Sequence, residues 1–198
     1  MTIRVLVADD QAMIRGALAG LLDLESDIEV VAQASDGARA LEELARLAAA
    51  GGPARASAPV DVAIIDVEMP HMDGITATQA ICSRFPAVRV LIVTTFGRPG
   101  YLQRALDAGA TGFMVKDAPV ETLADGVRTV AAGGRAIDQS LALDVLREVE
   151  GGGTIADIAR SLGLSQGTVR NHVSSSMLKM DARTRAEAAS LARAAGWL

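Results

Sequence analysis

Five polar residues stand where apolar runs of this chain end, and their types suit phosphoryl chemistry. They are Asp9, Asp10, Asp66, Thr94 and Lys116. Three carboxylates held close together repel one another and favour a divalent cation, and oxygen ligands favour Mg²⁺. Once the negative charge is neutralised, a carboxylate can attack phosphorus and form an acyl phosphate. Lys116 would place a positive charge beside the phosphoryl oxygens, and Thr94 would offer a hydroxyl donor.

The apolar runs that carry these residues predict the fold that brings them together. Strands are expected at 3–8, 28–32, 60–65, 88–94 and 112–115, with helical patterns between them. Continuously apolar strands alternating with helices predict an α/β fold, a flavodoxin-like doubly wound five-stranded parallel sheet covered on both faces. In such a sheet the carboxyl ends of the strands open into one crevice, so the five side chains should converge there. Asp66, at the end of the central third strand, is the expected nucleophile.

Composition limits the class of protein. The chain has 198 residues, half of them apolar and 3% aromatic, so aliphatic side chains must fill the core. The single cysteine, Cys82, excludes an internal disulfide framework and suits a reducing compartment. The first residues reach Asp9 and Asp10 before any signal-peptide pattern develops, and no apolar run is long enough to cross a membrane. We therefore expect a soluble, cytoplasmic protein without a membrane partner.

The remaining part of the chain differs in both charge and pattern. The net charge is −5, yet residues 151–198 hold six Lys or Arg against three Asp or Glu. After Gly133-Gly134 the strand patterns stop, and helices are predicted at 140–150, 155–162, 165–180 and 184–195. The expected organisation is a domain over 1–133, a linker over 134–140 and a small all-α domain over 141–198.

Two of these predicted helices form a helix-turn-helix pattern. Gly163 permits the turn after the helix at 155–162, and Ser165 caps the next helix. Apolar residues recur at helical spacing along the second helix, so one face of this helix should pack inward. Its outer face carries Gln166, Thr168, Arg170, Asn171, Ser174, Ser175 and Lys179. Short hydrogen-bonding groups and cations suit base edges and phosphates in a DNA major groove, whereas the competing interpretation is an ordinary amphipathic helix with a solvated polar face.

The first domain carries four motifs that resemble a known family. VADDQ, IIDVEMPHMDG, IVTT and GFMVKD together resemble the receiver domain of two-component response regulators over residues 3–132. The resemblance implies that Asp66 accepts a phosphoryl group from a sensor histidine kinase. It also implies that Asp10, Asp66 and the backbone carbonyl of Glu68 hold Mg²⁺, while Asp9 acts mostly through water.

The same resemblance implies a switch. Thr94 and Phe113 would form a pair in which the hydroxyl moves to the phosphoryl oxygen and the ring fills the vacated space. Phosphorylation would then shift the population toward a form in which the face near residues 95–118 pairs with a second receiver.

The helical tail is similar to LuxR-type domains of the NarL/FixJ class. The matching segments are IADIARSLGLSQGTVRNHVSSSMLKM and TRAEAASLARAAGWL. The residues implied to face DNA are Thr168, Arg170, Asn171, Ser174 and Lys179, with a phosphate or packing role for His172. One segment departs from the family, since the usual Leu-Thr-x-Arg-Glu opening is absent and residues 141–150 run directly into three glycines.

These patterns together predict a response regulator that is not an enzyme. Phosphorylated homodimers would bind promoter DNA with inverted half-sites. One alternative is a receiver-type interaction module whose shortened tail has impaired DNA binding. The other is a Mg²⁺-dependent phosphohydrolase that works through an aspartyl phosphate, although Glu68 stands where such enzymes normally carry a second Asp.

Overall fold

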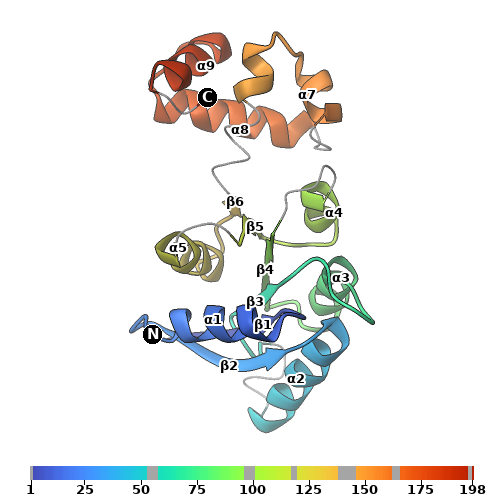
Figure 1. Cartoon of the computed structure of the whole chain (residues 1–198). Coiled ribbons are helices and arrows are strands. Elements are labelled where there is room, and N and C mark those ends of the chain that lie inside the picture. Colours follow the sequence, from blue (N-terminus) through green and yellow to red (C-terminus); the bar gives the residue numbers. More distant parts are fainter. Residues whose placement is uncertain are drawn as a thin grey trace. The chain divides into compact units, whose positions relative to one another are not determined.

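The computed structural model contains two compact units (Figure 1). It describes residues 2–52, 58–95, 101–116, 120–137, 146–161, 166–195 and 198. The first unit comprises Met1–Phe96 and Arg104–Ile137, and the second comprises Gly97–Gln103 and Asp138–Leu198.

The first unit is built on a parallel sheet with the order β2-β1-β3-β4-β5-β6. Its strands are β1 Ile3–Ala8, β2 Ile28–Ala34, β3 Val62–Ile65, β4 Arg89–Thr94, β5 Gly112–Val115 and β6 Ala136–Ile137. The five predicted strands and the flavodoxin-like fold class are confirmed. The structure adds β6, and it extends β2 two residues beyond the predicted end.

Helices cover both faces of this sheet, with α1 and α5 on one side and α2 and α3 on the other (Figure 1). The helices are α1 Ala12–Leu22, α2 Gly37–Ala50, α3 Gly74–Arg84, α4 Tyr101–Asp107 and α5 Val120–Ala131. Asp36 and Asp73 cap α2 and α3 by accepting hydrogen bonds from backbone N–H groups of the first turn. Three consecutive alanines, strong helix formers, carry α2 to Ala50.

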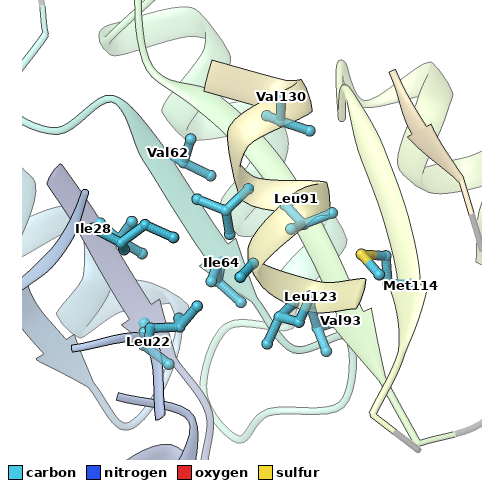
Figure 2. Close-up of a cluster of buried hydrophobic side chains, with 13 residues drawn as sticks. Leu22, Ile28, Val62, Ile64, Leu91, Val93, Met114, Leu123 and Val130 are labelled. Carbon is cyan, nitrogen blue, oxygen red and sulfur yellow. The ribbon is translucent and has the colours of Figure 1, made fainter. Parts of the chain in front are cut away.

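The main core lies between α1, α5 and the central strands. Figure 2 shows Leu123 and Val130 of α5 over Val62, Ile64 and Leu91 of the sheet. Burying each such aliphatic side chain contributes roughly 1.5–3 kcal/mol. Valine, leucine and isoleucine therefore hold the sheet rigid, and the polar residues that follow its strands are fixed in space.

The second unit is helical. It contains the helices α7 Ile155–Ser161, α8 Gln166–Lys179 and α9 Arg185–Ala194, and residues 146–150 are helical as well. Thr184 caps α9 by accepting from the N–H of Glu187, whose carboxylate accepts from the N–H of Arg183. A Thr followed three residues later by Glu is the capping-box pattern, which explains why α9 starts here.

Among the residues that the structure describes, no helix combines the length and the apolar character needed to cross a bilayer.

Candidate functional sites

Strand register brings the acidic residues together. Ala8 and Ile65 are register partners in the parallel pair of β1 and β3, so Asp9 and Asp66, the next residue on each strand, are neighbours. Carboxylate oxygens of Asp9, Asp10 and Asp66 all lie within 4.8 Å of one another. Asp9 and Asp66 are buried, whereas Asp10 is exposed. We call these three residues the acidic pocket.

Lys116 reaches the acidic pocket from the next-but-one strand. Thr94 of β4 is the register partner of Val115 in β5, which places Lys116 beyond the carboxyl end of the sheet. Its Nζ lies 2.6 Å from Oδ2 of Asp9 and 3.0 Å from Oδ2 of Asp66, and its side chain is 5% exposed. Among the described residues Nζ has ion-pair distances but no partner at hydrogen-bond angles. These contacts are therefore charge pairs that hold two carboxylates around one ammonium.

Burial and ion pairing have opposite effects on the pKa values of Asp66 and Lys116. Burial raises the pKa of the Asp66 carboxyl, and the ammonium of Lys116 offsets only part of that rise. Burial alone would lower the pKa of Lys116, but the carboxylates of Asp9 and Asp66 hold it above its ordinary value. Lys116 therefore stays charged at neutral pH and remains available to an anion.

Backbone groups fix the carboxylates. Oδ1 of Asp66 accepts from the N–H of Val67 at 2.8 Å, and Oδ1 of Asp9 accepts from the N–H of Gln11 at 2.9 Å. Arg15 donates to the backbone carbonyl of Asp9 at 2.6 Å. Each buried carboxylate thus has one oxygen held in place and presents the other to the pocket.

The donor set fits Mg²⁺. Three carboxylates supply hard oxygen ligands, which Mg²⁺ takes while it keeps part of its water shell. Oδ2 of Asp9 is buried and, beside its ion pair with Lys116, has no hydrogen-bond donor among the described residues, so it can also serve as a ligand to a cation. Glu68 is exposed. The group that the resemblance assigns to the cation at this position is its backbone carbonyl.

The expected switch residues lie on neighbouring strands. Thr94 ends β4 and Phe113 lies in β5, where it is the register partner of Ile92. Both side chains are 2% exposed. The backbone carbonyl of Thr94 accepts from the N–H of Lys116 at 2.8 Å, so the hydroxyl-bearing residue is tied directly to the pocket lysine.

In the second unit, α8 has the two faces that its sequence predicts. Val169 and Val173 are buried, and Met177 and Met180 pack against a small core. The side chains of the opposite face that the structure describes are all exposed: Gln166, Arg170, Asn171 and Ser174. The side chains of Thr168, Ser175 and Lys179, together with residues Gly163 and Ser165, lie outside the described part of the chain.

His172 is a feature of α8 whose burial the sequence did not specify. It is half-buried, and its Nε2 has no hydrogen-bond partner among the described residues. Burial lowers the pKa of this imidazole, which favours the neutral form. Partial burial agrees with the packing role that the resemblance to LuxR-type domains offered for His172 as one of two possibilities.

The short helical segment before the three glycines is integrated into the second unit. Glu150 forms an ion pair with Arg193 of α9 at 2.5 Å, and Glu148 accepts from the hydroxyl of Ser161 in α7 at 3.2 Å. Gly152 has φ +83°, a left-handed conformation that glycine adopts without strain. The glycines therefore turn the chain from this segment into α7.

Comparison with known proteins identifies both parts of the chain. Residues 5–128 match the family "Response regulator receiver domain", and residues 142–192 match "Bacterial regulatory proteins, luxR family". The chain belongs to the response regulator family, and it combines a receiver domain with a LuxR-type DNA-binding domain. It is thus a two-component response regulator.

The chain aligns with curated relatives along nearly their full length. The chain is 38% identical to the uncharacterized transcriptional regulatory protein YvfU of Bacillus subtilis, covering 99% of this chain and 100% of YvfU. It is 34% identical to the transcriptional regulatory protein DesR of the same organism, covering 98% of each. The YvfU alignment spans 210 positions against the 198 residues here, so this chain lacks residues that YvfU has.

Solved structures agree with this assignment. The response regulator ChrA of a heme-sensing two-component system is 29% identical, with a TM-score of 0.54, covering 100% of this chain and 99% of that one. The receiver domain of the putative response regulator NarL from Mycobacterium tuberculosis is 34% identical, with a TM-score of 0.58, covering 67% of this chain and 98% of that one.

Proposed function

We propose that a sensor histidine kinase phosphorylates Asp66 and that the phosphorylated chain dimerises on promoter DNA to regulate transcription. The observation that carries this proposal is the convergence of Asp9, Asp10 and Asp66 around the Nζ of Lys116. The corresponding functional division is a receiver over 1–133, a linker over 134–140 and a DNA-binding domain over 141–198.

Phosphoryl transfer uses the charges of the acidic pocket. A carboxylate oxygen of Asp66 forms a bond to phosphorus while the bond between phosphorus and the kinase histidine breaks, and the imidazole leaves with the electron pair. Asp9, Asp10, Asp66 and the backbone carbonyl of Glu68 would hold Mg²⁺, which neutralises phosphoryl charge when bound. Lys116 stabilises the phosphoryl oxygens, and the N–H of Val67 keeps the Asp66 carboxylate in one orientation.

Thr94 and Phe113 carry the signal out of the pocket. The Thr94 hydroxyl moves to the phosphoryl oxygen, and the Phe113 ring takes the space that it leaves. This favours an arrangement in which the face near residues 95–118 pairs with a second receiver. Residues 96–100 and 117–119 of that face lie outside the described part of the chain.

Dimerisation explains how one recognition helix per chain selects a promoter. Two copies of α8 related by a two-fold axis read inverted half-sites about one DNA turn apart. Arg170, Asn171 and Ser174 are exposed on α8 and supply base or phosphate contacts. Thr168 and Lys179 join them by resemblance to LuxR-type domains.

Sedimentation with and without beryllofluoride and Mg²⁺ tests the pocket and the switch together. We expect the wild-type chain to gain dimer and promoter affinity when both are added, and Asp66→Asn to gain neither. An equal gain in Asp66→Asn would refute the assignment of Asp66. Dimerisation without salt-dependent promoter binding would instead indicate an interaction module with an impaired tail.

A further inference from the structure

The start of α3 lies directly against the peptide of Asp66. A Cβ added at Gly74 would overlap the backbone carbonyl oxygen of Asp66 and lie 2.8 Å from its carbonyl carbon. Real side chains do not tolerate such an approach, so only glycine can occupy this position with the present backbone. The first residue of α3 is therefore in contact with the residue that accepts the phosphoryl group in the proposed function.

Hydrogen bonds continue this contact to the carboxylate itself. The N–H of Gly74 donates to the carbonyl of Val67 at 2.9 Å, and the N–H of Val67 donates to Oδ1 of Asp66 at 2.8 Å. Val67 is thus held at its carbonyl by α3, while its N–H sets the orientation of the Asp66 carboxylate. A shift of Gly74 would be passed on through one residue to Oδ1.

Thr78 secures Gly74 from inside the helix. Its side chain is fully buried, and its hydroxyl donates to the carbonyl of Gly74 at 2.6 Å. Asp73 fixes the same turn from outside by accepting from the N–H groups of Ile75 and Thr76, each at 2.9 Å. The first turn of α3 is therefore held on both sides at the point where it touches Asp66.

We infer that Gly74 and Thr78 are positioning residues for Asp66, which set the orientation of its carboxylate through the Val67 peptide. This inference rests on the proposed phosphorylation of Asp66. Neither residue touches the phosphoryl group. Both act by keeping α3 close enough for the Gly74 N–H to hold Val67. The orientation of the Asp66 carboxylate in the reaction should therefore depend on how α3 packs.

The test uses full-length variants and a small-molecule phosphodonor. Intact-mass spectrometry measures the rate at which each variant is phosphorylated. We expect Gly74→Ala to lower the rate at saturating Mg²⁺ about 100-fold, the effect of misplacing a reacting group by about 1 Å. Gly16→Ala is the matched control, since no described atom lies within 4 Å of a Cβ added there.

A second pair of variants decides the matter if Gly74→Ala does not fold. Thr78→Val keeps the shape of the side chain but loses its hydroxyl, whereas Thr78→Ser keeps the hydroxyl. We expect Thr78→Val to react several-fold more slowly at an unchanged unfolding midpoint and Thr78→Ser to recover the wild-type rate. Rates within twofold of wild type for a folded Gly74→Ala, or equal rates for Thr78→Val and Thr78→Ser, would overturn the inference. A wild-type chain that accepts no phosphoryl group would refute the proposed function instead.

Discussion

Replacing Leu146 by alanine should destabilise the DNA-binding unit strongly, although Leu146 belongs to a segment that departs from the usual LuxR-type opening. Its side chain is 1% exposed and shares a cluster with Ala188 and Ala192 of α9, which Met177 of α8 and Met180, just beyond the end of α8, extend. Alanine partners cannot move to fill a cavity, whereas the flexible methionines can fill part of it. We therefore expect a loss of about 3 kcal/mol, the middle of the range for buried Leu→Ala changes.

A loss of that size is large for a unit this small. A unit of about 70 residues has an unfolding free energy of roughly 3–10 kcal/mol. A change of about 3 kcal/mol shifts the folding equilibrium about a hundredfold, since each 1.4 kcal/mol is about a factor of ten. Leu146→Ala should therefore lower promoter affinity at 37 °C by populating the unfolded unit, while phosphorylation of the receiver stays unchanged.

Urea unfolding followed by circular dichroism measures this loss. Leu178→Ala is the matched control, because Leu178 lies in the same unit at 84% exposure and its truncation should change the free energy by about 0.5 kcal/mol or less. If Leu146→Ala costs less than 1 kcal/mol, or no more than Leu178→Ala, the segment at 146–150 is not part of the folded core and the reasoning is wrong.

Three further changes test separate features. Asp36→Ala removes the cap that accepts from the N–H of Arg39 at 2.9 Å and should cost about 1 kcal/mol in urea unfolding, with Asp36→Asn retaining most of it. That hydrogen bond lowers the pKa of Asp36, so the contribution is present above the unfolded pKa and is lost as the pH falls through the folded one. Burial lowers the pKa of His172 below 6.5, so acidification below about pH 6.5 should destabilise the second unit, and a pH series in which His172→Gln remains equally acid-sensitive would contradict this. Arg170→Ala should weaken promoter binding and reduce the salt slope of its affinity by about 1, in fluorescence anisotropy titrations where Arg185→Ala serves as the charge-matched control.

The main features of the receiver followed from its sequence because strand pattern and polar position reinforce each other. Asp9 and Asp66 follow register partners, so locating the two strands was enough to predict that their side chains meet. The caps that Asp36 and Asp73 form are similarly local, because each side chain accepts from backbone N–H groups two or three residues further along the chain. Such features depend on a few neighbouring residues and on a periodicity of apolar residues that is visible in the sequence.

Other features depend on distances that no local pattern encodes. A two-residue strand such as Ala136–Ile137 is too short to show alternation or an apolar run. The overlap that a side chain at Gly74 would make with Asp66 involves backbone positions brought together by the loop that precedes α3. His172 could be placed on a helix from sequence, but the burial of its Nε2 is a property of the packed unit.

The position of β2 in the sheet has a consequence for handling the protein. In the described sheet β2 is an outermost strand with β1 as its single neighbour, and at seven residues it is the longest strand. An open edge of that length is a template on which another chain can add a strand, which is how many proteins begin to aggregate. Exposed Glu29 and Gln33 oppose this by keeping the edge polar. Concentrated stocks should therefore remain clear longer than those of a variant in which Glu29 and Gln33 are both replaced by valine.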